Sequence, residues 1–408
     1  MSGTHSVLAP SDSERWLRCV GALHLSKGLP DIDKEYNASG TCSHWLLEWA
    51  LTHPDLDLYD WLGKTMTFGD SQKFEFKIDE ERLERVQSTV RAINREPGLM
   101  LTETLLDTTP VLGVPHQSGH SDIIKAYPEG GVMKDGKLLR GVLSVHDFKD
   151  GFILVHAKDN TQGLIYLCAA MFQFALTGDY EAFRFCIHQP KINHYDEWTY
   201  TRGELESFMT LIRPVAKLAY DIYFGAVEFD PAKHLSAGEE QCLWCPVRGR
   251  CPARAARIAS LFEPLIKRHE LDDASIGLLY AQLDEIEAAC SDFRAEAFRR
   301  ATMGVKIEGQ KLVYGNKGKR KWADERAAEA ALKDKVEGSL TVAKDAIYEP
   351  RTIISPTQAE KLLKKTYAGL EAYVTQSEPQ LRLVPLAHKG EAVELPKFSP
   401  VPEEGALI

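Results

Sequence analysis

A short apolar run, Gly141–Val145, leads within two residues into Asp147-Phe148-Lys149. This run predicts a buried strand, Val142–Phe148, that ends in a carboxylate and a lysine. The tripeptide by itself is weak evidence of a site, because Glu75-Phe76-Lys77 and Asp135-Gly136-Lys137 have the same acid-x-Lys order. The segments around the strand therefore have to distinguish the first tripeptide from the other two.

Those segments predict an α/β fold class. A β-rich region lies between two predicted helices. The first covers Asp79–Glu96 by its helical periodicity, and the second starts at Thr161 with Asn160 as its cap. The expected strands are Leu101–Leu106, Ser121–Tyr127, Val142–Phe148, Ile153–His156 and Ala182–His188, followed by a helix at Gly203–Phe224. Ser121–Tyr127 and Val142–Phe148 form a hairpin in this reading. The order predicts a mixed central β-sheet flanked by helices.

Length and composition favour more than one domain. The chain has 408 residues and 44% apolar content, enough for a large core and a prior of two or three domains. We expect a first domain at 1–265, an accessory α+β region at 266–394 and a flexible Pro-rich tail at 395–408. Within the second region, Asp272–Ala301 reads as a helix and Val305–Tyr314 as a hairpin.

Net charge and apolar runs bound the location and the partners. No apolar run approaches membrane-spanning length and the N-terminus does not resemble a secretory leader, so we expect a cytoplasmic protein that does not bind membranes. The net charge of -10 argues against a protein that coats polyanions. A local basic cleft can still hold nucleic acid against an acidic remainder.

The hairpin brings several chemical groups together. Asp122, in Gly119-His120-Ser121-Asp122, starts one strand, and Asp147 and Lys149 end the next, so antiparallel pairing sets the carboxylates side by side. Carboxylates bind hard divalent cations, and a lysine offsets charge that develops on a phosphate. The alternative is that Asp147 and Lys149 are solvated residues entering the Asp150-Gly151 turn.

Two helices add further candidates. His44 and Glu48 share one helix face, where His44 can bind a metal and Glu48 can orient a ligand or a water. Gln162 and Tyr166 share a face of the helix that starts at Thr161, where they can contact substrate. Each pair taken alone also fits a purely structural role.

These elements, in this order, resemble the RecB-like nucleases of the PD-(D/E)xK superfamily. The resemblance implies a restriction-endonuclease-like core that holds one or two Mg²⁺ or Mn²⁺ ions. The implied ligands are His44, Asp122, Asp147 and the backbone carbonyl of Phe148, while Lys149 and Gln162 match the catalytic lysine and the motif glutamine. The usual Pro-Asp pair is replaced here by Gly119-His120-Ser121-Asp122.

A cysteine group predicts a second metal centre. Cys242 and Cys245, followed after five intervening residues by Cys251, are spaced as thiolate ligands, and the fourth ligand is either Cys19 or Cys42. Spacing alone allows zinc or an iron-sulfur cluster. The pattern resembles the iron-sulfur branch of RecB-like nucleases, which includes CRISPR-associated adaptation nucleases and the AddB subunit. That resemblance implies a structural [4Fe-4S] cluster on Cys19, Cys242, Cys245 and Cys251.

Basic residues suggest where DNA binds. We expect contacts to its backbone from Arg248, Arg250, Arg254, Lys319, Arg320 and Lys321, with Trp322 beside them to stack on a base. A solvated surface is the alternative.

Taken together, these features predict a Mg²⁺- or Mn²⁺-dependent deoxyribonuclease. The chain to about residue 390 resembles a family of phage and prophage proteins, which implies an exonuclease on single-stranded or free-ended DNA. Its role would lie in phage recombination, replication or repair in the cytoplasm of a bacterial host, with proteins of those processes as partners. The alternative is a catalytically silent DNA-binding or partner-binding protein on the nuclease scaffold.

Overall fold

The computed structural model describes residues 6–29, 34–267, 271–315, 320–337, 347–349, 352–364, 368–385 and 389–393. The chain forms two compact units, Met1–Ile286 and Glu287–Ile408. The boundary expected at residues 265 and 266 falls at the last residues of helix α10, Pro252–Ile266, within the first unit. The expected tail, 395–408, lies outside the described residues.

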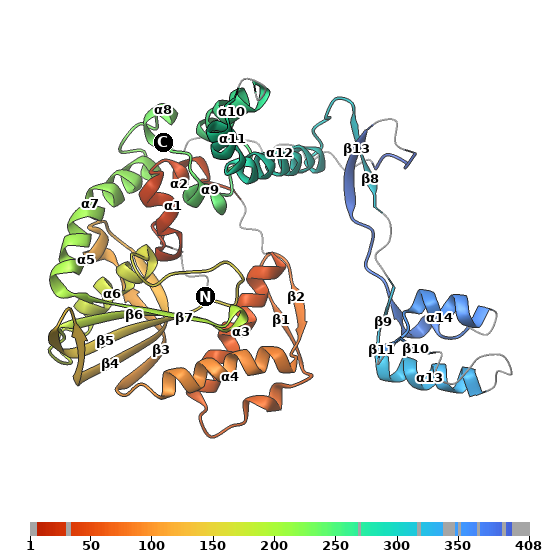
Figure 1. The fold of residues 1–408 in the computed structure, drawn as a ribbon, viewed down its shortest axis with the longest axis horizontal. Helices are drawn as coiled ribbons and strands as arrows, with labels where there is room; N and C mark the ends of the chain where they lie inside the picture. Colours follow the sequence, from red (N-terminus) through yellow and green to blue (C-terminus); the bar gives the residue numbers. More distant parts are fainter. Residues whose placement is uncertain are drawn as a thin grey trace, which may run out of the picture. The chain divides into compact units, whose positions relative to one another are not determined.

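A five-stranded mixed sheet forms the centre of the first unit (Figure 1). Its strands, in spatial order, are β3 Leu99–Asp107, β4 Ser118–Lys134, β5 Lys137–Phe148, β6 Ala182–Gln189 and β7 His194–Thr201. β5 and β6 are parallel and the other neighbours are antiparallel. A parallel pair needs a crossover, which α6, Thr161–Gln173, supplies. The predicted mixed central sheet is confirmed.

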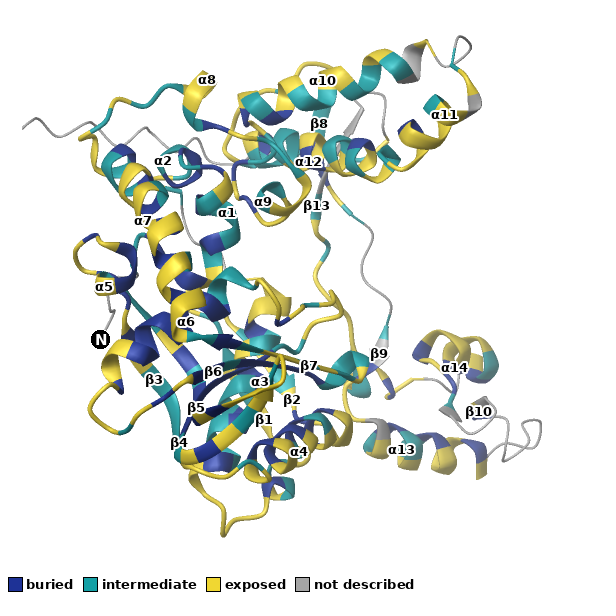
Figure 2. Cartoon of the chain, turned by 60° about the vertical axis from the view of Figure 1, so that its left-hand side comes forward, coloured by how far each residue is buried: buried dark blue, intermediate teal, exposed yellow. Residues whose placement is uncertain are grey.

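Helices α6 and α7 (Arg202–Phe224) cover one face of this sheet. The Asn160 side chain caps α6 by accepting a hydrogen bond from the Gly163 amide, as predicted. The helix is mostly dark blue in Figure 2 because nine of its residues are buried. Its apolar side chains pack against alternate residues of the strands, among them Ile124 and Val145.

The opposite face packs on α3 (Glu35–Thr52) and α4 (Glu80–Asn94). These helices share a second apolar cluster with Ile123 and Phe148 of the sheet, to which a two-stranded hairpin also contributes. The hairpin strands are β1 Thr65–Phe68 and β2 Phe74–Lys77. Strand β5 is thus covered on both faces, which explains its nearly continuous apolar run.

Short elements complete the first unit. They are η1 Pro10–Asp12, α1 Ser13–Arg18, α2 Ala22–Leu25, η2 Leu58–Trp61, α5 Thr109–Leu112, η3 Pro190–Ile192, α8 Pro231–His234, α9 Glu239–Leu243 and α11 Asp273–Tyr280. Among the described residues, no helix has both the length and the apolar content needed to cross a bilayer.

The second unit combines helices with short antiparallel strand pairs. Helix α12, Leu283–Thr302, leads into it. Its other elements are β8 Gln310–Tyr314, β9 Lys321–Trp322, α13 Glu325–Glu337, β10 Tyr348–Glu349, β11 Thr352–Ile353, α14 Pro356–Leu363, η6 Glu371–Tyr373, β12 Val374–Thr375 and β13 Leu381–Pro385. A small apolar cluster around Trp322, Leu332 and Ile347 holds the α13 and α14 region together.

Three predictions about elements are wrong. Ile153–His156 is not a strand, because the backbone there bonds to a side chain: the Val155 amide donates to Gln189 Oε1 at 2.8 Å. Val305–Tyr314 is not a hairpin, since β8 pairs with the distant β13. Asp272–Ala301 is interrupted between α11 and α12.

Candidate active site

The end of β5 brings together side chains from several elements of the first unit. The pairing of Ile123 with His146 sets Asp122 of β4 beside Asp147 of β5. Asp122 Oδ2 accepts a hydrogen bond from the Phe148 amide at 2.8 Å, and His44 Nδ1 of α3 lies 3.3 Å from Asp122 Oδ1. The hairpin register therefore produces the carboxylate pair that the sequence suggested.

Lys149 is held in a closed arrangement with two partners. Its Nζ lies 3.1 and 3.0 Å from the two carboxylate oxygens of Asp147 and donates to Gln162 Oε1 at 3.2 Å. Gln162 Nε2 in turn donates to Asp147 Oδ1 at 3.2 Å. The α6 helix thus fixes both the acid and the lysine at the strand end.

Burial makes the charges of this site interdependent. Burial lowers the pKa of His44, but the Asp122 carboxylate overcomes it and raises this pKa to about 9. Burial raises the pKa of Asp122, and the charges of His44 and Lys149 bring it below its ordinary value. For Asp147 burial prevails and the pKa is raised, whereas the pKa of Lys149 is raised against burial by the Asp147 carboxylate.

Glu103 belongs to the site, although sequence reasoning did not select it. One ligand atom each of His44, Glu103 and Asp122 lie within 4.8 Å of one another. Glu103 lies opposite Asp122, between the paired positions Thr102 and Thr104, with a left-handed φ of 44°. Burial and the Asp122 charge raise its pKa to about 7. The available signal was an acid in the middle of a predicted strand, between apolar residues on either side.

The remaining predicted residues border this group. Tyr166 is buried on α6 one turn after Gln162, and burial together with the Asp147 charge raises the pKa of its hydroxyl. Glu48, one turn after His44, is near enough for its charge to raise the pKa of Glu103. For the backbone carbonyl of Phe148, the metal contact stays a prediction.

The alternative reading, in which Asp147 and Lys149 are solvated residues before a turn, is wrong, because Asp147 is 4% exposed and pairs with Lys149. Asp150, the next residue, anchors the end of β5. Its side chain is 1% exposed, lies 3.1 Å from Arg85 Nε and accepts a hydrogen bond from Ser43 Oγ at 2.7 Å. Arg85 belongs to α4 and Ser43 to α3. The residue after Lys149 therefore ties the strand end to both helices.

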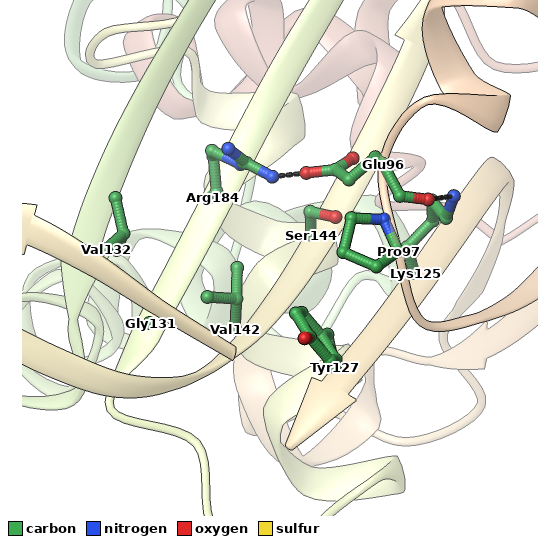
Figure 3. A pocket seen from close by; sticks show the side chains of 9 residues that line it. All are labelled: Glu96, Pro97, Lys125, Tyr127, Gly131, Val132, Val142, Ser144 and Arg184. Atoms are coloured by element: carbon green, nitrogen blue, oxygen red, sulfur yellow. Dashed lines mark hydrogen bonds and ion pairs between the residues drawn. The ribbon is translucent and has the colours of Figure 1, made fainter. Parts of the chain in front are cut away.

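A cavity of about 210 Å³ opens on the face of the sheet opposite the site at Asp122 and Asp147 (Figure 3). Its charged groups all have partners: the Glu96 carboxylate accepts from Arg184, and Lys125 Nζ donates to the backbone carbonyls of Ile93, at 2.8 Å, and Glu96. His146 Nε2 lies 2.7 Å from the same carboxylate. This network joins the end of α4 to the sheet.

The cysteines expected to bind a metal converge in the first unit. Cys19 and Cys251 share a small apolar cluster. Burial raises the pKa of the Cys19, Cys242 and Cys245 thiols, and the charge of at least one other thiol of the group raises each of them further. Cys19 Sγ also accepts from the Ser236 amide at 3.3 Å. Cys42 lies apart, in the apolar cluster of α3 and α4.

The predicted DNA-binding residues have mixed positions. Arg254 is 6% exposed and donates to the Arg248 carbonyl, so burial removes it from a DNA surface, whereas Arg250 is exposed. Arg320 pairs with Glu360. Trp322 is not available for stacking, because it is buried and donates to the Ile354 carbonyl at 2.9 Å. Lys319 and the side chain of Lys321 lie outside the described residues.

Comparison with known proteins gives a family and a distant structure. Residues 5–391 match the family model described as "Protein of unknown function (DUF2800)". A solved structure titled "Crystal structure of SSO0001" is 9% identical in sequence, with a TM-score of 0.28. That alignment covers 62% of this chain and 90% of the other.

Proposed function

The chain belongs to DUF2800, a family described as of unknown function, and we propose that it is a metal-dependent deoxyribonuclease with a RecB-like, restriction-endonuclease-like core. One observation carries the proposal: Asp122, Asp147 and Lys149 meet at the end of β5 with His44 and Gln162. Two carboxylates suit a hard metal ion, and a lysine beside them can offset charge that develops on a phosphate, so the group fits metal-assisted phosphodiester hydrolysis.

The charges of the site fit a divalent cation. Three carboxylates, Glu103, Asp122 and Asp147, lie around one lysine and one histidine, and burial together with the Asp122 charge raises the pKa of Glu103. A bound cation would offset this negative charge and take the place of the His44 proton. His44, Glu103 and Asp122 would hold Mg²⁺ or Mn²⁺, with Asp147 and the Phe148 carbonyl adjacent. When bound, such an ion polarises the phosphodiester.

The chain's own groups position the reaction. The Lys149 ammonium, fixed by Asp147 and Gln162, can orient the attacking water and offset negative charge on the phosphate. Because these partners are hydrogen-bonded to one another, the lysine is ordered before substrate binds.

The proposed substrate is DNA that is single-stranded or has free ends. The protein would degrade it as an exonuclease in phage recombination, replication or repair. Exposed aromatic rings with lysines beside them lie on the loop from Lys149 to Gln162 and on its neighbours. Lys191 Nζ lies 4.7 Å from the ring centroid of Phe152, and Lys158 Nζ 4.6 Å from that of Trp198. Such pairs suit unpaired bases and their phosphates.

We also propose that Cys19, Cys242, Cys245 and Cys251 hold a structural [4Fe-4S] cluster. The convergence of the four thiols and the amide hydrogen bond to Cys19 Sγ fit this group. Zinc is the alternative, but with bonds of about 2.3 Å it would bring its sulfur ligands to about 3.8 Å from one another. Among the described residues, no three of these sulfurs all lie within 4.8 Å of each other.

End-labelled DNA tests the proposal. The anaerobically purified full chain is incubated with single- and double-stranded substrates and Mn²⁺, beside Lys149→Ala and the control Lys77→Ala. We expect degradation by the wild type and the control, and at least a 100-fold lower rate for Lys149→Ala. Binding without cleavage would instead favour the silent scaffold. Iron and sulfide analysis of the same sample separates the cluster from zinc.

A further inference from the structure

A second group of potential metal ligands lies between β7 and the loop that follows β5. The loop supplies His156, and β7 supplies His194 and Asp196. One ligand atom of each lies within 4.8 Å of the others. The two imidazole rings meet edge to face, with centroids 6.1 Å apart and planes at 86°.

Backbone groups of the loop orient two of these side chains. His194 Nε2 lies 3.1 Å from the Val155 carbonyl, which can only accept, so Nε2 carries the proton and Nδ1 keeps its lone pair for a ligand. Asp196 Oδ2 accepts from the Ala157 amide at 2.8 Å. Ligating histidines and carboxylates in metal sites are typically held by hydrogen bonds of this kind.

The spacing of His156 and Asp196 also points to a shared ion. Their Nδ1 and Oδ2 atoms are 3.6 Å apart, longer than a hydrogen bond between such groups. Two ligand atoms of a tetrahedral zinc ion, at bond lengths of about 2.0 to 2.1 Å, lie about 3.3 Å from each other. The pair is therefore spaced more like ligands of one ion than like a direct hydrogen bond.

We propose that His156, His194 and Asp196 bind a zinc ion. Two imidazoles and one carboxylate, with a fourth position open to water, are a ligand set that zinc accepts. Softer nitrogen ligands distinguish this group from the carboxylate-rich site at Asp122. Zinc binding here does not depend on the proposed nuclease function.

The ion would fasten the loop that joins Lys149 to Gln162. β6 and β7 already hold the loop backbone through side chains: Gln189 accepts from the Val155 amide, and the Tyr200 hydroxyl from the Asp159 amide at 2.6 Å. The His156 side chain is 68% exposed, and a shared zinc ion would tie it to β7. The loop's order would then depend on zinc.

Zinc titration of the chelator-treated full chain against a chromophoric competitor tests the site. We expect His156→Ala and Asp196→Asn to bind one zinc equivalent fewer than the wild type, or to bind it at least tenfold more weakly. His53→Ala, which alters an exposed histidine on another element, is the matched control. With Co²⁺ as the probe, the lost signal should lack the sulfur-to-cobalt charge-transfer band, which excludes the cysteine group.

Limited trypsin digestion gives a second readout that does not depend on the other metal sites. Zinc should slow cleavage after Lys158 at least several-fold in the wild type and in His53→Ala, but not in His156→Ala. Because His156 is exposed, its replacement should leave the fold intact, which circular dichroism checks. Equal zinc stoichiometry and affinity in all the variants, or zinc-independent cleavage in the wild type, would overturn the proposal.

Discussion

Asp147-Phe148-Lys149 and Glu75-Phe76-Lys77 place an acid, a phenylalanine and a lysine in the same order at the ends of two strands, β5 and β2, with Lys149 directly after the last residue of β5. Both phenylalanines contribute to the same apolar cluster, Phe148 fully and Phe76 in part. The flanking charges differ. Asp147 is 4% exposed, whereas Glu75 and Lys77 are exposed to solvent.

The difference follows from the strand that carries each tripeptide. β5 is central in its sheet, so Asp147 and Lys149 must find partners in the protein, and they find them in each other and in Gln162. β2 belongs to a two-stranded hairpin, where water solvates the charges. An acid-Phe-Lys pattern thus gains chemistry from burial and from its neighbours.

Neutralising the two acids should give the largest contrast. Asp147→Asn keeps the shape of the side chain but removes the charge that fixes Lys149, so we expect at least a 100-fold loss of Mn²⁺-dependent cleavage. Glu75→Gln should stay within about twofold of the wild type. Initial rates on end-labelled DNA measure both. Similar rates for the two variants would remove the functional distinction between the tripeptides.

Replacing each of the two phenylalanines by alanine should lower the free energy of unfolding by different amounts. Phe148 is fully buried, so Phe148→Ala should lower the free energy of unfolding by about 3–5 kcal/mol. Phe76 is only partly buried, and Phe76→Ala should cost about half as much or less. Denaturant unfolding followed by circular dichroism gives both values. An equal loss would mean that the hairpin is as integral to the core as β5.

Acid should destabilise the sheet next to the end of β5 through His188. This histidine belongs to β6, where it pairs with Phe148 of β5. Burial and the nearby His146 lower the pKa of His188 to about 3, below about 6.5 in the unfolded chain. The unfolded chain is therefore protonated first, and stability is lost as the pH falls from about 6.5 toward 3.

Between pH 7.5 and 5.5 this loss amounts to about 1.4 kcal/mol of unfolding free energy. His188→Gln should abolish this loss of unfolding free energy. His53→Gln, at an exposed position, should leave the pH dependence of stability unchanged. Parallel slopes of stability against pH for the wild type and His188→Gln would show that the buried ring does not titrate as described.

Much of the first unit could be predicted because local signals and packing agree there. The apolar run of β5, the Asn160 cap and the periodicity of α4 all survive in the structure. The hairpin register of β4 and β5 then follows, and with it the approach of Asp122 to Asp147.

Other features depend on distant contacts that a linear pattern does not record. Glu103 joins the site because the pairing of β3 with β4 sets it opposite Asp122. Arg254 and Trp322 lie in basic stretches of sequence that suggest an exposed surface, yet each is buried and donates to a backbone carbonyl. β8 pairs with β13, far along the chain, so the expected local hairpin does not form.

Mn²⁺ binding measured together with cleavage tests the central claim most directly. Free Mn²⁺ is followed by electron paramagnetic resonance as it is titrated into the wild type, Asp122→Asn and Asp196→Asn, and DNA cleavage is measured in the same samples. We predict that Asp122→Asn alone weakens Mn²⁺ binding at the β5 site at least tenfold and loses cleavage with it. Wild-type binding and cleavage in Asp122→Asn would contradict the account.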